Sequence, residues 1–281
     1  MKISYLGPEG SYSHIAALNI FSDKAEFIPA ATITNALHDL SSGLVDKAVV
    51  PIENSSSGGV AETVEAFQKI ENIYINNEYV LPIKHALLVP TNCDDLTAIT
   101  EVRAHHMALN QCMEFIRNHL PNAEILPSSS NSSAAKALAK KLAANPEAKS
   151  AVIASELCGE IYGLKLEKTA INDSNLNATR FWVCSKEPAD LNTQAKNKTT
   201  ILFQTKDESG SLQTVLRLFA VNNINLSRIE SRPAKKNIGE YLFLIDFDLH
   251  RDDKRYDELL RQAKQHFTYY KWLGSYSQID N

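Results

Sequence analysis

The chain has 281 residues, of which 44% are hydrophobic and 22% are charged, and its formal net charge at pH 7 is -4. These values are ordinary for a globular protein of about two domains. The sequence has no basic block, so nucleic-acid binding gets no electrostatic support. The first residues turn polar too soon for a signal peptide, and no run approaches the ~20 apolar residues of a membrane span. We therefore expect a protein of the cytoplasm with no membrane or nucleic-acid partner.

The cysteines and histidines do not predict a metal site. The four cysteines, at positions 93, 112, 158 and 184, lie far apart and lack Cys-x-x-Cys spacing, so a disulfide framework or a zinc site is not expected. His105 and His106 are adjacent, and adjacent helical residues do not face each other. Reduced, mostly buried thiols are the expected state in the cytoplasm.

Two polar, glycine-rich loops follow predicted strands in the first part of the chain. The loop at 7–13 connects a strand at 2–6 to a helix that ends at 21, and the loop at 53–59 connects a strand at 47–52 to a helix at 60–70. If the two strands are parallel neighbours, their loops face one crevice. Free amides at helix starts attract anions, so the loops predict a binding cleft. A capped turn without a ligand would show the same local pattern.

Further alternating elements complete two predicted α/β lobes. The region 73–90 suits two β segments around Leu81-Pro82, as expected where the chain crosses between lobes. His85 lies in this crossing and could line the crevice, although a lone histidine is more often a satisfied core residue. The remaining strands are expected at 26–29, 101–104, 125–126, 151–154 and 164–169, and the remaining helices at 32–40, 105–119, 131–144 and from 155.

The stretch Asn177-Ala178-Thr179-Arg180-Phe181 opens the next strand. Arg180 could bind a carboxylate through its two-pronged guanidinium, and Thr179 could donate a hydrogen bond to a departing oxygen. The alternative is plain β-propensity with a surface cation. The pair is therefore a candidate site that needs support from other motifs.

Four separated segments, in this order, closely resemble the prephenate dehydratase family. They are Gly-Pro-Glu-Gly-Ser-Tyr-Ser-His at 7–14, Val-Pro-Ile-Glu-Asn-Ser at 50–55, Leu-Pro-Ile-Lys-His at 81–85 and Asn-Ala-Thr-Arg-Phe at 177–181. The resemblance covers most of residues 1–186. It implies a two-lobed α/β catalytic domain, periplasmic-binding-protein-like, with its site in the cleft. The family converts prephenate to phenylpyruvate, with loss of carbon dioxide and water, on the route to phenylalanine.

The resemblance also implies roles for individual residues. Thr179 matches the family's catalytic threonine, and we interpret it as a hydrogen-bond donor or proton relay because a threonine hydroxyl is a very weak acid. Aromatisation drives the reaction, so the enzyme need not form a covalent intermediate. No cofactor and no metal are expected. The implied substrate-binding residues are Glu9, Asn54, Ser55, His85, Arg180 and Phe181.

One segment departs from the family's pattern. Where the family usually carries Ser-His-Pro-Gln-Ala, this chain has Ala-His-His-Met-Ala at 104–108. His105 and Ala108 match, whereas the serine, the proline and the glutamine do not. If those three side chains contact substrate, affinity or specificity will differ here.

A polar linker at 187–198 precedes a second predicted domain at 199–281. Strands are expected at 199–205, 224–231, 240–248 and 269–273, with helices at 211–221 and 256–266. This βαββαβ order predicts a ferredoxin-like sandwich. Three segments in it, at 210–212, 223–226 and 230–233, resemble an ACT regulatory domain, in which phenylalanine binds between paired domains. The implied effector residues are Gly210, Leu212, Asn225, Leu226, Glu230, Ser231, Arg232 and Pro233.

The sequence thus predicts a cytoplasmic prephenate dehydratase that is inhibited by L-phenylalanine and forms a homodimer or homotetramer through its ACT domains. Three alternatives stay open. An arogenate dehydratase would use a substrate with an amino group in place of the keto group. The departure at 104–107 would suit a non-catalytic amino-acid sensor, although the intact 179–181 motif argues against it. A solute-binding protein shares the two-lobed architecture, but the ACT-like domain argues against that class.

Overall fold

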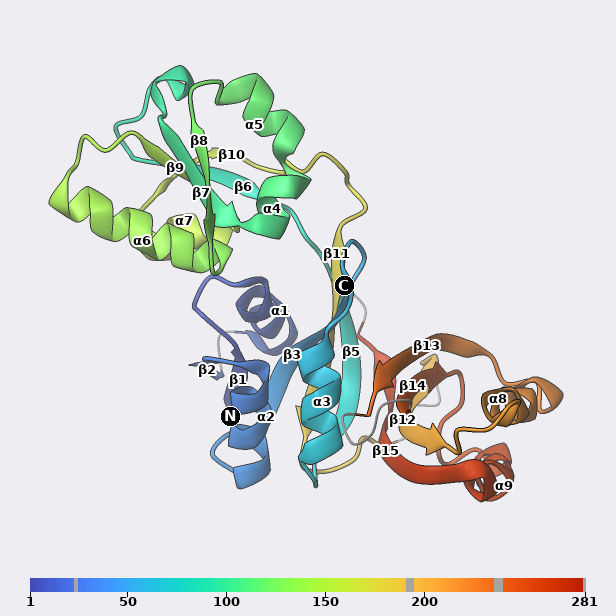
Figure 1. Ribbon diagram of the computed structural model, residues 1–281. Coiled ribbons are helices and arrows are strands. Elements are labelled where there is room, and N and C mark those ends of the chain that lie inside the picture. Colours follow the sequence, from blue (N-terminus) through green and yellow to red (C-terminus); the bar gives the residue numbers. More distant parts are fainter. Residues whose placement is uncertain (23–24, 191–194, 235–239, 280–281) are drawn as a thin grey trace.

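The computed structural model describes residues 1–22, 25–190, 195–234 and 240–279. In Figure 1 two lobes lie one above the other, and a third unit lies beside the lower lobe. The lower lobe and the third unit share a ten-stranded sheet, whereas the upper lobe has its own five-stranded sheet. The mixed α/β fold with a two-lobed part is the one that the sequence predicts.

The first lobe carries both predicted cleft loops. Its elements are β1 (Lys2–Leu6), α1 (Tyr12–Phe21), β2 (Glu26–Ala30), α2 (Ile33–Ser42), β3 (Lys47–Asn54), β4 (Gly58–Gly59), α3 (Ala61–Lys69), β5 (Tyr74–Pro82) and β11 (Ala178–Ser185). Strand β1 pairs in parallel with β2 on one side and β3 on the other. The loops after β1 and β3 therefore lie at the same edge of the sheet, as predicted.

The second lobe is inserted between β5 and β11. Its elements are β6 (Ala86–Val89), η2 (Leu96–Ala98), β7 (Glu101–His105), α4 (His106–Gln111), α5 (Met113–His119), β8 (Glu124–Ser128), α6 (Asn131–Ala144), β9 (Ser150–Ala154), α7 (Glu156–Tyr162) and β10 (Lys165–Lys168). The single helix expected at 105–119 is instead two helices that meet at Cys112. Because the helix restarts there, the Asp173 carboxylate accepts a hydrogen bond from the Glu114 amide in the first turn of α5.

Two crossing segments join the lobes and are hydrogen-bonded to each other. The backbone amide of Ile83 donates to the Asn177 carbonyl oxygen at 2.8 Å. Asn172, before the second crossing, bonds the backbone of the first crossing with its side chain. Its Oδ1 accepts from the His85 amide at 2.7 Å, and its Nδ2 donates to the Ile83 carbonyl oxygen at 3.2 Å. The crossing predicted within 73–90 is thus found at 83–85, between β5 and β6, and it lies directly beside the 177–181 motif.

The third unit has the predicted βαββαβ order. It comprises β12 (Asn197–Thr205), α8 (Ser211–Val221), β13 (Leu226–Pro233), β14 (Tyr241–Phe247), α9 (Lys254–Ala263), η3 (Lys264–His266) and β15 (Phe267–Gln278). Helices α8 and α9 contribute Val215, Phe219, Leu259 and Leu260 to a core with one face of the sheet. Part of the predicted linker, 191–194, lies outside the described residues.

The other face of this unit packs against the first lobe. Leu202, Leu244 and Tyr276 belong to the same buried cluster as Trp182 and Cys184 of β11. Strand β15 is longer than the expected 269–273, and its end pairs in parallel with β5, with Ser277 opposite Asn77. The β13-β14-β12-β15 order therefore continues as β5-β11-β3-β1-β2 in one sheet. Within the described ranges, no helix is long and apolar enough to cross a membrane.

A close backbone approach makes this junction sensitive to one glycine. Gly274 has φ 155°, and a Cβ atom there would lie 2.3 Å from the Ile75 carbonyl oxygen. We expect Gly274→Ala to lower the free energy of unfolding by about 2–4 kcal/mol, because the backbone of β5 must move. Urea denaturation measures this change.

Gly163→Ala is the matched control. Gly163 also has positive φ, 66°, but a Cβ atom there would meet nothing within 4 Å, so only the backbone penalty of about 1 kcal/mol remains. Equal losses in the two variants would contradict the close approach at Gly274.

Candidate active site

A cavity of about 280 Å³ lies between the two lobes, where the predicted loops meet. It receives the starts of α1 from the first lobe and α6 from the second, whose caps Ser11 and Ser130 accept hydrogen bonds from the His14 and Ser133 amides. Helix starts present free amides and a partial positive charge. The lining residues are Leu6, Gly7, Gly10, Ser11, Tyr12, Ser13, Pro51, His105, Ser129, Ser130, Asn131, Ser132, Ser155, Thr179 and Phe181.

Thr179 reaches this cavity from the start of β11, opposite Asn54 at the end of β3. Asn54 Nδ2 donates to the Thr179 hydroxyl oxygen at 2.9 Å and also to Asn177 Oδ1 at 3.0 Å. Asn54 Oδ1 accepts from the Ser56 and Ser57 amides, which fixes the orientation of the side-chain amide. Because the Thr179 oxygen already accepts this bond, its proton is free to be donated to a ligand.

Behind Thr179, a chain of polar side chains links the lobes across the crossing. Asn177 Nδ2 donates to Gln111 Oε1 at 2.9 Å, and the same Gln111 oxygen lies 2.9 Å from His85 Nε2. His85 Nδ1 lies 2.8 Å from the Tyr12 hydroxyl. Burial lowers the pKa of His85, although the bond to Gln111 opposes that shift. His85 is therefore positioned by contacts at both ring nitrogens and does not line the cavity.

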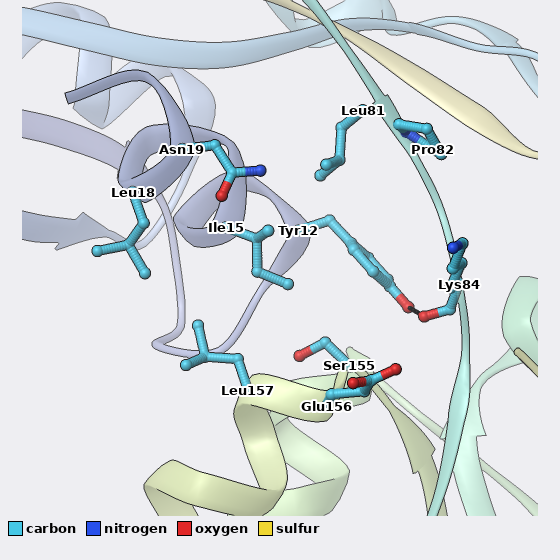
Figure 2. Close-up of a pocket in the computed structure, with 10 residues that line it drawn as sticks. All are labelled: Tyr12, Ile15, Leu18, Asn19, Leu81, Pro82, Lys84, Ser155, Glu156 and Leu157. Carbon is cyan, nitrogen blue, oxygen red and sulfur yellow. Dashed lines mark hydrogen bonds between the residues drawn. The ribbon is translucent and has the colours of Figure 1, made fainter. Parts of the chain in front are cut away.

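Tyr12 lines both this cavity and a second pocket of about 330 Å³ behind it. Figure 2 shows the Tyr12 hydroxyl directed at the Lys84 carbonyl oxygen, 2.8 Å away, with Ile15 and Leu157 on the opposite wall. The second pocket is mostly apolar, as its lining by Leu18, Leu81 and Pro82 indicates. The Tyr12 hydroxyl thus contacts both the segment between β5 and β6 and the His85 ring. The Tyr12 ring separates the two pockets.

Arg180 does not lie where the sequence interpretation placed it. Side chains alternate along a strand, so Thr179 and Phe181 line the cavity and Arg180 lies on the reverse face. Its guanidinium makes three ion pairs, with Glu53, Glu78 and Asp246 at 2.5, 3.1 and 3.0 Å. The structure therefore does not support a substrate carboxylate as its partner, and we correct that interpretation to a structural role.

The other predicted substrate residues differ in how close they lie to the cavity. Phe181 lines it, and Asn54 reaches it through Thr179. Ser55 instead bonds the Leu176 carbonyl oxygen and the Ala178 amide, which fixes the segment before Thr179. Glu9 is exposed and lines a neighbouring surface pocket with Lys136.

In the segment that departs from the family's pattern, only the matching His105 is among the lining residues. Burial lowers the pKa of His105, and so does the neighbouring His106. Ala104 is buried in β7, and His106 is exposed. The departures therefore change the surroundings of the cavity more than its wall.

Sequence reasoning missed Gln111, Asn177 and Tyr12 as parts of this network. Asn177 and Tyr12 stand inside the recognised motifs, and Gln111 lies just after 104–108. Polar type and position in a motif were thus available as signals, but the pairing between lobes was not. Among the residues that the structure describes, no group of three His, Cys, Asp or Glu side chains could hold a metal ion.

The predicted effector residues are divided between two faces of the third unit. Gly210 and Leu212 line a surface pocket at the start of α8, and Asn225 Nδ2 donates to Asp248 at 2.9 Å. Glu230 and Arg232 point toward the first lobe, where Arg232 donates to the Gly59 carbonyl oxygen at 3.1 Å. Leu226 and Pro233 are the two ends of β13, and Ser231 within it is exposed. One chain alone therefore does not gather these residues into a single pocket.

Comparison with known proteins agrees with both halves of this description. A family model for prephenate dehydratase matches residues 3–189, and one for the ACT domain matches residues 199–267. The chain is 34% identical over 276 residues to a bifunctional chorismate mutase/prephenate dehydratase of Aquifex aeolicus, covering 98% of this chain and 73% of that protein. It is 31% identical to a prephenate dehydratase of Bacillus subtilis, covering 98% of each.

A solved structure supports the same assignment. A prephenate dehydratase from Arthrobacter aurescens, crystallised in complex with L-Phe, superposes with a TM-score of 0.89 at 32% identity, covering 99% of this chain and 90% of that one. With matches over nearly the whole length and a cleft built from the motif residues, the chain belongs to the prephenate dehydratase family and carries an ACT domain.

Proposed function

We propose that the cleft converts prephenate to phenylpyruvate, carbon dioxide and water, with Thr179 assisting departure of the ring hydroxyl. The observation that carries this assignment is the bond from Asn54 to the Thr179 oxygen, which leaves the threonine proton for the substrate. Phe181 and Pro51 on the same wall supply apolar surface for a six-membered ring.

Neutral donors can hold both carboxylates of prephenate. The lining residues include four serines from the two lobes beside the starts of α1 and α6 (Ser11, Ser13, Ser130 and Ser132), and no Lys, Arg, Asp or Glu. Helix-start amides bind anions without a formal charge. The carboxylate that must leave as neutral carbon dioxide is then not held by an ion pair, and a water-poor site favours loss of its charge.

The electron flow needs no outside reagent. The bond between the ring and its carboxylate breaks, and its electron pair enters the ring. The carbon–oxygen bond to the hydroxyl on the opposite ring carbon breaks, and hydroxide leaves with the electron pair of that bond. A proton from the Thr179 hydroxyl or relayed through it converts hydroxide to water, and solvent restores the threonine proton.

We also propose that L-phenylalanine regulates this activity at the ACT domain. The Arthrobacter relative binds L-Phe, and the predicted effector residues here are divided in a way that a second chain could complete. Strand β13 ends the sheet path among the described residues, so its open edge could pair with a second copy. We further propose that the protein is a homodimer or homotetramer in the cytoplasm, with domains at 1–186 and 199–281.

The effector motif also contacts the first lobe. Glu230 is paired with both Arg228 and Arg232, and these arginines donate to the carbonyl oxygens of Ile52 and Gly59. Both carbonyls lie on the β3–β4 hairpin whose turn begins at Asn54. Effector binding that moves β13 would therefore bias the hairpin that holds Thr179, as a two-state coupling requires.

Thr179→Val should lower kcat for prephenate by about 10²–10⁴-fold, because valine keeps the shape and β-propensity of threonine but cannot donate a proton. Phenylpyruvate formation by purified protein, without added metal, measures this. Thr179→Ser is the matched variant that keeps the hydroxyl, and it should retain most of the activity. Wild-type turnover in the valine variant would remove Thr179 from the mechanism.

Arg232→Ala should weaken inhibition by phenylalanine at least about ten-fold, on the scale of a 1–3 kcal/mol coupling energy, while turnover without effector changes little. Inhibition curves and direct phenylalanine binding separate lost affinity from lost coupling. Arg261→Ala is a control on the exposed surface of α9, because Arg261 does not line the pocket that contains Gly210 and Leu212. An unchanged inhibition curve for Arg232→Ala would contradict the assigned effector motif.

Paired assays with prephenate and arogenate address the substrate. We expect the larger kcat/KM with prephenate. Preference for arogenate would change the substrate but keep the site. Phenylalanine binding without turnover of either compound would favour an amino-acid sensor on the same scaffold.

A further inference from the structure

The interface between the ACT domain and the first lobe contains a cluster of charged side chains that the reaction does not use. Arg180 lies at its centre, with a side chain only 14% exposed, and the Asp246 side chain is fully buried. Lys198 of β12 donates to Glu78 at 2.6 Å and completes the cluster. Burial of so many charges calls for an explanation, because each costs several kcal/mol of lost solvation.

Asp246 is itself held firmly on the ACT side. Its Oδ2 accepts from Arg180 at 3.0 Å, and its Oδ1 accepts from the Thr200 hydroxyl at 2.8 Å. The Thr200 hydroxyl also lies 2.7 Å from the Tyr276 hydroxyl. Burial acts to lower the pKa of Arg180, but the nearby carboxylates, with Asp246 foremost, raise it overall. Arg180 is therefore a permanent cation with an oriented partner.

The backbone beside Thr179 is paired differently with its two neighbouring strands. Strand β11 pairs with β3 through Thr179–Asn54 and Arg180–Glu53, but the register shifts before Phe181, which pairs with Pro51. Ile52 is left between the two pairs, and Pro51 has no amide hydrogen to donate. A register shift interrupts the ladder, so β3 holds the end that carries Thr179 less firmly than the rest of the strand. On its other side, β5 pairs with this end in unbroken register from Ala178 to Val183.

We propose that Asp246 of the ACT domain is a positioning residue for the dehydratase reaction, which acts through Arg180 to hold Thr179 at the cleft. Arg180 is the direct neighbour of Thr179, so its ion pair with Asp246 fixes the first residues of β11. The carboxylate contacts neither the cavity nor the substrate. This inference rests on the proposed role of Thr179, and it makes the ACT domain a structural part of the active site.

Asp246→Asn tests the proposal, because asparagine keeps the size of the side chain and removes its charge. We expect kcat to fall roughly five- to fifty-fold at nearly constant KM, since misplacing a catalytic group by about 1 Å can cost about a hundred-fold. Amide hydrogen exchange of the peptide 177–183 should become about five-fold faster or more, with the rest of the sheet unchanged. Exchange does not depend on turnover, so it tests the restraint even if the wild-type protein fails to convert prephenate, a result that would instead reject the proposed function.

Lys271→Met is the matched control. Lys271 is an ACT cation whose side chain is 12% exposed. It also crosses to the first lobe, where it donates to the Ile70 carbonyl oxygen at 2.7 Å and pairs with Glu71. It does not contact the Arg180 cluster, so kcat and exchange at 177–183 should match the wild type. A similar effect in both variants would reduce Asp246 to a general interdomain contact and overturn the proposal.

Thr200→Val covers the case in which Asp246→Asn does not fold. It preserves every charge and removes only the hydroxyl that orients Asp246, so we expect the same changes with smaller size. Wild-type kcat and exchange in whichever variants fold would overturn the proposal. Faster exchange spread evenly over the whole sheet would also contradict it, because general loosening is not positioning.

Discussion

The alternation of side chains along β11 is the constraint on which the active site and the domain interface both depend. Thr179 and Phe181 line the cleft, and Arg180 between them lies on the opposite face and binds three carboxylates. One short strand therefore carries the cleft hydroxyl, for which we propose the catalytic role, and the interdomain cation on consecutive residues. A shift of register by one residue would exchange the two faces, so the chemistry and the attachment of the ACT domain are specified together.

The charged cluster behind β11 fixes the relative positions of strands more than it adds to the free energy of unfolding. Buried ion pairs often add no more stability than apolar residues of the same size, whereas removal of one partner is costly. Arg180 offers a planar set of donors in fixed directions, and its partners come from β3, β5 and β14. Few relative positions of those strands satisfy all of the contacts, so the cluster favours one orientation of the ACT sheet on the first lobe.

The neutral lining of the cleft follows the same separation of roles. An arginine side chain in the cleft beside Thr179 would stabilise the ring carboxylate in its charged form. An interaction that stabilises only the bound substrate does not lower the barrier to its decarboxylation. With Arg180 on the reverse face, the substrate meets amides, hydroxyls and rings. Two polar side chains, Asn54 and Gln111, then fix the groups around the hydroxyl without adding charge. The formal charges of the Arg180 cluster therefore lie behind β11, where they orient strands, and neutral hydrogen-bonding groups line the cleft.

Local pattern in the sequence was sufficient for most elements and for the loops that form the cleft. Helices at 131–144 and 211–221 have the expected bounds, because their apolar spacing and their first residues are local signals. Motif resemblance located Thr179 and Asn54 for the same reason. Strand β15 was expected to end at Leu273, yet pairing with β5 extends it to Gln278.

The error at Arg180 shows where a single sequence stops being informative. Residue type pointed to a carboxylate, and carboxylates are indeed its partners, but they belong to the protein. Alternation along the strand could have placed Arg180 on the reverse face. No local signal, however, indicates that Asp246, far along the chain and in a different domain, would be opposite it. That contact depends on how the ACT strands continue the sheet of the first lobe. The pairing of β15 with β5 that joins them forms only in the folded chain. The residues that join the two domains are therefore the ones that sequence patterns are least able to identify.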